Sequence, residues 1–226
     1  MKISSSELDI EEEKEEQFDL SSIKDSFNIV IMGDSLVGKT SILERFCNDF
    51  FKKEKYNNNY LQTFKKIHIY NKKKYLVKFW DPPSFIDNCN DSEINMFRNC
   101  EGVIYTCSYD NSASLIHINT WYQFLTQYID LSTKEMVLLI NKKDLNEENK
   151  LINENQIDKK SKDLQLQFFE ISAKTGENVL ISINKFINKI IEKYKKDNKN
   201  NGEEEDESTE SDNENDEEKD EGCLVF

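Results

Sequence analysis

The 226-residue sequence contains only two histidines, and its five cysteines are not spaced to bind a metal. No C-x-x-C pair occurs, which argues against a zinc site and favours reduced thiols over a disulfide framework. Cys100 and Cys107 flank an apolar run and are expected to be small core residues. His68 and His117 are far apart and are expected to be structural. Neither a metal cluster nor a nucleophilic triad is therefore predicted.

Long apolar runs are also missing from the sequence. No stretch approaches the roughly 18 residues that a membrane span needs. The first residues lack the basic-then-apolar order of a secretory signal. We therefore expect the chain to be made and kept in the cytosol.

Positive charge is scarce overall, because the formal net charge is −14. Residues 1–25 hold 9 acidic and 3 basic residues, and residues 203–221 hold 13 acidic residues and 1 basic residue. The rest of the chain carries a net charge of about +4, so the acidity belongs to the tails. Its most basic cluster, residues 71–74, is expected to be a hairpin turn, and nucleic-acid binding is not predicted.

Composition divides the chain into three parts. The acidic segments 1–25 and 197–226 have few apolar residues and are predicted to be disordered extensions. Residues 26–196 are predicted to form one domain, for which the supply of 14 Phe, 9 Tyr and 2 Trp is enough to build a core.

Residues 33–40 read Gly-Asp-Ser-Leu-Val-Gly-Lys-Thr and fit G-x-x-x-x-G-K-[ST], the pattern of a loop that cradles phosphates. An apolar run at residues 27–32 is typical of a buried strand. Residues 41–46 carry apolar side chains at helical spacing. The motif therefore stands between a strand and a helix, which is the setting it requires.

Four residues of this loop have predicted roles. Gly33 and Gly38 keep side chains out of a tight curl whose N–H groups bind phosphate. Lys39 is expected to reach the outer phosphates. Thr40 offers a hydroxyl to Mg²⁺ at the positive N-terminus of the helix. The sequence therefore predicts a bound nucleoside di- or triphosphate.

Short apolar runs and helical stripes alternate along the domain, which predicts an α/β fold. Two apolar stripes, from Leu115 to Ile129 and from Val179 to Tyr194, indicate core-facing helices. The strands are predicted at residues 27–32, 64–70, 75–80, 103–105, 136–140 and 168–171, with the second and third as an antiparallel pair. We expect a doubly wound, mostly parallel six-stranded sheet of the P-loop NTPase type, with helices on both faces and ligands beyond the carboxyl ends of the strands.

Three further loops follow predicted strands. Asp81, after Trp80, can hold Mg²⁺ through water. In the sequence Asn-Lys-Lys-Asp at residues 141–144, the Asp144 carboxylate can accept two N–H groups of guanine, a donor pair that adenine lacks. Lys142 can lay its methylene stem along the base while its ammonium stays in water. In Ser-Ala-Lys at residues 172–174, the Ala173 N–H can reach guanine O6.

With these motifs the chain resembles the Ras superfamily of small GTPases over residues 26–196, and within it the Rab branch. The Rab-like features are GDSLVGKTS, the Trp80-Asp81 pair, and Ser114-Leu115 followed by Trp121. The resemblance implies that GTP or GDP binds with Mg²⁺ held by Thr40 and Asp81, and that Phe51 packs edge-on against the base. The implied nucleotide contacts are Gly33, Ser35, Leu36, Val37, Gly38, Lys39, Thr40, Ser41, Phe51, Asn141, Lys142, Asp144, Ser172, Ala173 and Lys174.

The chain departs from the family pattern in both switch segments. In place of a switch threonine within Thr-x-Gly, residues 59–61 read Asn-Tyr-Leu, and the nearby Thr63 is expected to point elsewhere. In place of Asp-x-x-Gly-Gln, residues 81–85 read Asp-Pro-Pro-Ser-Phe. Phe85 cannot orient an attacking water, and the two prolines stiffen a segment that normally moves. No catalytic residue is therefore predicted, and intrinsic GTP hydrolysis is expected to take hours or longer.

The last four residues, Cys223-Leu224-Val225-Phe226, fit a C-a-a-X box and predict geranylgeranyl transfer to Cys223. A single lipid chain anchors only marginally, and the acidic tail should be repelled by an anionic leaflet. We expect a monomer that exchanges between cytosol and the cytoplasmic face of an intracellular or plasma membrane. The implied partners are a prenyltransferase and exchange, activating and effector proteins.

Two hypotheses remain open from the sequence. One is a membrane-tethered Rab-like GTPase that cycles slowly and recruits effectors in vesicle traffic. The other is a non-catalytic interaction module in which the nucleotide is structural. The guanine motifs support both, while Asn59, Ser84 and Phe85 favour the second and the predicted Mg²⁺ residues favour the first.

Overall fold

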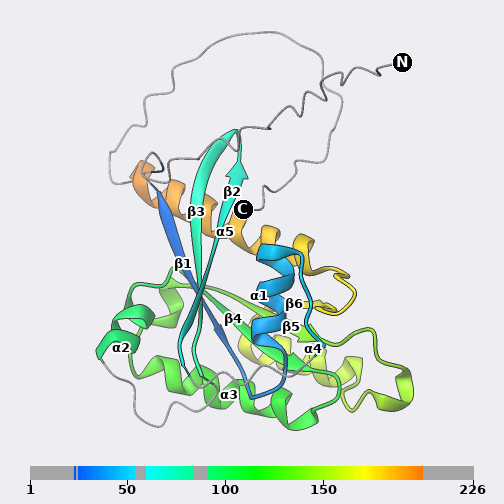
Figure 1. The fold of residues 1–226 in the computed structure, drawn as a ribbon. Helices are drawn as coiled ribbons and strands as arrows, with labels where there is room; N and C mark the ends of the chain where they lie inside the picture. The colour runs from blue at the N-terminus through cyan, green and yellow to red at the C-terminus, as the bar shows by residue number, and fades with distance from the viewer. Residues whose placement is uncertain (1–22, 24, 54–59, 84–90, 201–226) are drawn as a thin grey trace, which may run out of the picture.

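The computed structural model describes residues 23, 25–53, 60–83 and 91–200, in which six strands form one sheet of order β2-β3-β1-β4-β5-β6 (Figure 1). Within these residues β2 and β3 pair antiparallel and the other neighbours pair parallel. The predicted mostly parallel six-stranded sheet is therefore confirmed. The strands are β1 (Ser26–Met32), β2 (Gln62–Tyr70), β3 (Lys73–Asp81), β4 (Gly102–Ser108), β5 (Glu135–Asn141) and β6 (Gln167–Glu170).

Helices cover both faces of the sheet, as predicted. One core cluster joins the sheet to α1 (Lys39–Asn48) and α5 (Val179–Asn200). The other joins it to α2 (Asp91–Arg98), α3 (Ser112–Thr126) and α4 (Glu154–Leu164). Two short 3₁₀ turns, Leu131–Thr133 and Glu147–Asn149, lie next to β5 in the chain.

The strand β1 shows why its sequence is a continuous apolar run. Successive side chains of a strand point to opposite faces. Ile29 and Ile31 therefore enter the core with α1 and α5, whereas Val30 and Met32 enter the core on the opposite face. All four side chains are buried, which is typical of a parallel strand covered by helices on both sides.

The turn between β2 and β3 is shorter than the predicted turn at residues 71–74. Asn71 and Lys72 have φ values of 49° and 62°, while Lys73 and Lys74 already belong to β3. A two-residue hairpin loop of this kind requires positive φ at both central residues, which favours asparagine. The structure thus keeps the predicted hairpin and shortens its turn.

Two helices were not predicted, because each carries a short apolar stripe. Only Met96 and Phe97 of α2 are buried, and Ile157 is the buried residue of α4. The signal for α4 lies in its start, where Asn153 and Gln156 form a capping box.

Two predicted helix ends also shift. α3 ends at Thr126, before Ile129, although Ile129 still packs in the core. α5 continues to Asn200, beyond the expected domain end at residue 196. Residues 1–22 and 201–226, which hold most of the two expected extensions, lie outside the described residues.

The three described cysteines are buried. Cys100 and Cys107 are core residues as predicted, Cys47 is buried as well, and burial raises the pKa of Cys100 to about 11. His68 is buried on β2, where its Nε2 lies 2.7 Å from Asn188 Oδ1. Among the described helices, none combines the length and the apolar composition of a transmembrane segment.

Candidate nucleotide-binding site

The predicted phosphate loop connects β1 to α1, and two glycines allow it to lie against neighbouring strands. A Cβ on Gly33 would lie 2.2 Å from Thr106 O of β4, and a Cβ on Gly38 would lie 2.3 Å from Asn141 Nδ2. Both glycines also have positive φ, at 149° and 98°. Any side chain at these two positions would push the loop away from the sheet.

Lys39 binds the carbonyl groups at the start of this loop. Its Nζ donates to the carbonyl oxygens of Gly33 (2.9 Å) and Asp34 (3.1 Å), and the residue is 7% exposed. Burial lowers the pKa of the Lys39 ammonium, while the carboxylates of Asp81 and Asp34 oppose that effect. The first turn of α1, which is described in full, holds no acidic side chain to offset its positive N-terminus. The loop therefore combines a buried ammonium with a helix N-terminus, a setting that favours an anion.

A hydroxyl and a carboxylate meet beside the loop. Thr40 Oγ1 donates to Asp81 Oδ2 at 2.5 Å, and both residues are buried. Asp81 is the last residue of β3, which pairs with β1. The phosphate loop connects the end of β1 to Thr40 at the start of α1, so the pairing of the two strands brings these two side chains together. Mg²⁺ prefers oxygen ligands and usually takes only one or two from protein when it also binds phosphates. The two predicted metal residues therefore fit such an ion.

Asn141, the last residue of β5, joins two loops of the site. Its Nδ2 donates to Val37 O at 2.9 Å, and its Oδ1 accepts from the Ala173 N–H at 3.0 Å. Asn141 therefore ties the phosphate loop to residues 172–174. The contacts of Asn141 and of the Ala173 N–H with guanine stay predictions.

Asp144 is held as an ionised acceptor, as recognition of guanine requires. Its Oδ1 accepts from Ser172 Oγ at 2.6 Å, and its Oδ2 lies 3.1 Å from Lys174 Nζ. Burial by itself would raise the pKa of Asp144, but the bonds from Ser172 and Lys174 hold it below its usual value. The structure therefore brings the predicted residues Asp144, Ser172 and Lys174 together.

Lys142, in residues 141–144, contacts the phosphate loop. Its Nζ donates to Leu36 O at 2.9 Å and to the Asp110 carboxylate at 2.8 Å. These contacts lie at the surface, where the Lys142 side chain is 29% exposed, and the contact of its methylene stem with a base stays a prediction. Lys142 and Leu36 both have positive φ, at 65° and 66°, without being glycine.

Arg45 is a residue of the site that the sequence analysis missed. From α1 its Nε donates to Ala173 O at 3.0 Å and its Nη2 to Lys174 O at 3.1 Å. A third contact, 2.7 Å to Asp49 Oδ1, pairs it one helical turn along. That i,i+4 pairing was the signal in the sequence, but it does not reveal the contact with residues 172–174.

The remaining predicted residues divide into described and undescribed ones. Ser35 is exposed and Ser41 is half-buried, both within or next to the loop. Phe51 is half-buried against the core cluster of α1 and α5, and its contact with a base stays a prediction. Thr63 is exposed on β2, opposite Trp80. The predictions for Asn59, Ser84, Phe85 and Cys223 concern positions outside the described residues.

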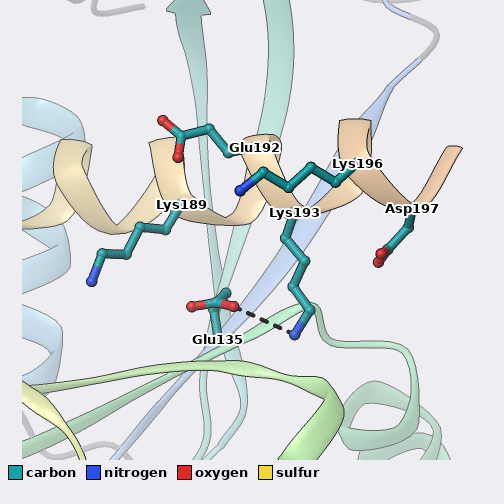
Figure 2. Close-up of a pocket in the computed structure, with 6 residues that line it drawn as sticks. All are labelled: Glu135, Lys189, Glu192, Lys193, Lys196 and Asp197. Atoms are coloured by element: carbon teal, nitrogen blue, oxygen red, sulfur yellow. Dashed lines mark ion pairs between the residues drawn. The ribbon is translucent and has the colours of Figure 1, made fainter. Parts of the chain in front are cut away.

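A depression of about 270 Å³ lies away from this site, between α5 and the start of β5 (Figure 2). Figure 2 shows that its side chains are all charged: Glu135, Lys189, Glu192, Lys193, Lys196 and Asp197. Lys193 Nζ lies 3.4 Å from Glu135 and donates to Thr133 O at 2.9 Å. Glu135 begins β5, and Asn141 ends it next to the phosphate loop. This depression and the phosphate loop therefore lie at opposite ends of the strand β5.

Comparison with known proteins agrees with the fold. The Ras family matches residues 28–192. "Ras-related protein RabG2" of Dictyostelium discoideum is 29% identical over 69% of this chain and 77% of that protein. "Ras-related protein Rab-13" of Mesocricetus auratus is 28% identical over 68% of this chain and 74% of that protein. "Ypt/Rab-type GTPase YPT7" of Saccharomyces cerevisiae is 26% identical over 69% of this chain and 77% of that protein.

A phosphate loop between β1 and α1, beside loops that end β3, β5 and β6, defines a P-loop protein with an α/β sheet. The chain belongs to the Ras family, and its Rab-named relatives place it on the Rab branch.

Proposed function

We propose that this protein is a Rab-like GTP-binding protein that binds GDP and GTP together with Mg²⁺. One observation carries the proposal. An ionised acceptor, Asp144, lies beside a phosphate loop, and Asn141 and Lys142 join the two through hydrogen bonds to Val37 and Leu36. A ligand with guanine at one end and phosphates at the other satisfies both halves of this site.

Each residue then has a defined part in nucleotide binding. The Asp144 carboxylate accepts the two N–H groups of guanine. Lys39 exchanges the carbonyls of Gly33 and Asp34 for phosphate oxygens. Thr40 and Asp81 hold Mg²⁺, which when bound neutralises phosphate charge.

The proposed place of action is a membrane engaged in vesicle trafficking, which the Rab names of the relatives support. The C-a-a-X sequence supports a prenyl anchor at Cys223. Phe85 stands where a water-orienting glutamine is expected, which supports weak intrinsic hydrolysis that an activating protein accelerates.

The alternative is a non-catalytic, membrane-tethered interaction module. The replacement of both switch sequences, at residues 59–61 and 81–85, favours it. A switch needs contacts that differ between the two nucleotide states, and these replacements remove the usual groups that sense the γ-phosphate. In this alternative the nucleotide stabilises the fold and is not turned over.

Nucleotide binding is tested by identifying the nucleotide that copurifies with the full chain and by measuring GDP affinity. Asp144→Asn replaces one acceptor oxygen with an N–H₂ donor. It should weaken GDP binding and strengthen binding of xanthosine diphosphate, whose base carries a second carbonyl oxygen. Asp158→Asn, an exposed change on α4, is the matched control. Equal GDP affinity in both variants would refute the proposed site.

Hydrolysis is tested separately by following preloaded GTP under single turnover with Mg²⁺. GTP that decays over hours supports the slow switch. GTP that persists for days supports the non-catalytic module. In the first case Phe85→Gln should accelerate decay, since it restores a side chain that can orient water.

A further inference from the structure

The phosphate loop is also held by two side chains that belong to none of the nucleotide motifs. Trp121 Nε1 donates to Asp34 Oδ1 at 2.9 Å, and His117 Nδ1 lies 2.7 Å from Asp34 Oδ2. An ionised carboxylate only accepts hydrogen bonds, so the histidine nitrogen is the donor. His117 and Trp121 are four residues apart on α3 and therefore lie on the same face of that helix.

Asp34 connects α3 with Lys39, the lysine proposed to bind phosphate. Its carboxylate binds α3, while its carbonyl oxygen accepts from Lys39 Nζ at 3.1 Å. The other end of the loop is anchored elsewhere, since Leu36 and Val37 are bound by residues 142 and 141. The two halves of the loop are thus attached to different elements, the first half to α3 and the second half to residues 141 and 142 at the end of β5.

The position of Asp34 matters because its side chain is negatively charged and belongs to an anion-binding loop. A freely rotating carboxylate there would repel phosphate. Two N–H donors fix its direction and spread its charge over charge-assisted hydrogen bonds. The Asp34 side chain is 18% exposed and that of His117 is 52% exposed, so the contact lies at the edge of the site.

We propose that His117 and Trp121 are positioning residues that hold Asp34, and through it the first half of the phosphate loop, in the nucleotide-binding conformation. Because the positioned loop holds the phosphates, these two residues slow the dissociation of the nucleotide. This inference rests on the proposed guanine-nucleotide binding and adds two residues that are not among the predicted nucleotide contacts.

The test measures GDP dissociation from the full chain in Mg²⁺ for Trp121→Phe, His117→Ala and His117→Gln. Trp121→Phe keeps an aromatic ring next to Phe124 and removes the N–H donor together with part of the indole. We expect it to accelerate GDP release about tenfold, which corresponds to about 1.4 kcal/mol. His117→Ala should act in the same direction, and His117→Gln should restore part of the loss because it keeps an N–H donor. Gln123→Ala, an exposed change on α3, is the control and should leave the rate unchanged.

Two further readouts separate positioning from a general loss of stability. Guanosine lacks phosphates, so its affinity should be the same in Trp121→Phe and the unmodified chain. In a background of Asp34→Ala the Trp121→Phe change should have no additional effect, because its acceptor is gone. Unchanged GDP release, an equal loss of guanosine binding, or additive effects would each overturn the inference while nucleotide binding stands. An unmodified chain that binds no guanine nucleotide would overturn the proposed function and this inference together.

Discussion

Asn141→Ala should destabilise the chain even when no nucleotide is bound. The asparagine side chain is buried and bridges Val37 O and the Ala173 N–H, both in buried residues. Alanine leaves this carbonyl and this N–H without their partner. A buried polar group that loses its partner costs about 1–3 kcal/mol, so the two together cost about 2–6 kcal/mol. This is a large share of the roughly 5–15 kcal/mol that stabilises a typical domain.

The assay is urea unfolding of the full chain after its nucleotide has been removed. A lower midpoint with an unchanged slope reports lost stability of the folded state. The matched control is Asn146→Ala, because Asn146 is exposed and its described side chain does not cap the turn that follows. The control should unfold at the midpoint of the unmodified chain.

The opposite result would refute this reasoning. If Asn141→Ala unfolded like the control but bound GDP much more weakly, the amide would act on the nucleotide directly. That outcome would support the direct nucleotide contact of Asn141 that the resemblance implies. If both stability and affinity fall, the loss of affinity follows from the loosened loops.

Three further predictions concern other contacts. Gly33→Ala should abolish GDP binding in an equilibrium titration, because its Cβ would lie 2.2 Å from Thr106 O and the loop would have to move. Arg45→Ala should weaken GDP affinity by about 1–3 kcal/mol by calorimetry, since two hydrogen bonds to residues 173 and 174 are lost; unchanged affinity would show that this loop holds without them. Burial raises the pKa of Glu101 even though it accepts the Asn28 N–H, so its charge destabilises the fold above that pKa and the penalty fades as the pH falls through it. Glu101→Gln should therefore raise stability to urea at neutral pH and give little change in mild acid; a loss at neutral pH would contradict this sign.

Much of the fold could be predicted, because strand and helix periodicity is local information. The run at residues 27–32 was buried on both faces, and the long stripe from Val179 became α5. The helices α2 and α4 were missed because few of their side chains reach the core. The end of α3 was misplaced because Ile129 is buried by packing beyond the helix.

The site shows a similar division between residue types and contacts. The motifs located Lys39, Thr40, Asp81 and Asp144, and the structure brings Thr40 to Asp81 and Asp144 to Ser172. They did not reveal Arg45, or the contacts that His117 and Trp121 make with Asp34. Those residues are separated by more than 80 positions from the loop they hold, and no spacing rule connects them.

The sequence by itself determined the class of this protein, because glycine, lysine and aspartate at fixed spacing are the groups that phosphates, Mg²⁺ and guanine require. It also determined which face of each long element is buried, through the repeat of its apolar residues. Only the tertiary structure decided how the loops are joined. The Ala173 N–H is bound to Asn141, the Lys142 ammonium to Leu36 O and Asp110, and Asp34 to α3. These contacts depend on which strand ends lie side by side. That strand order is set when the sheet forms with one core packed on each of its faces.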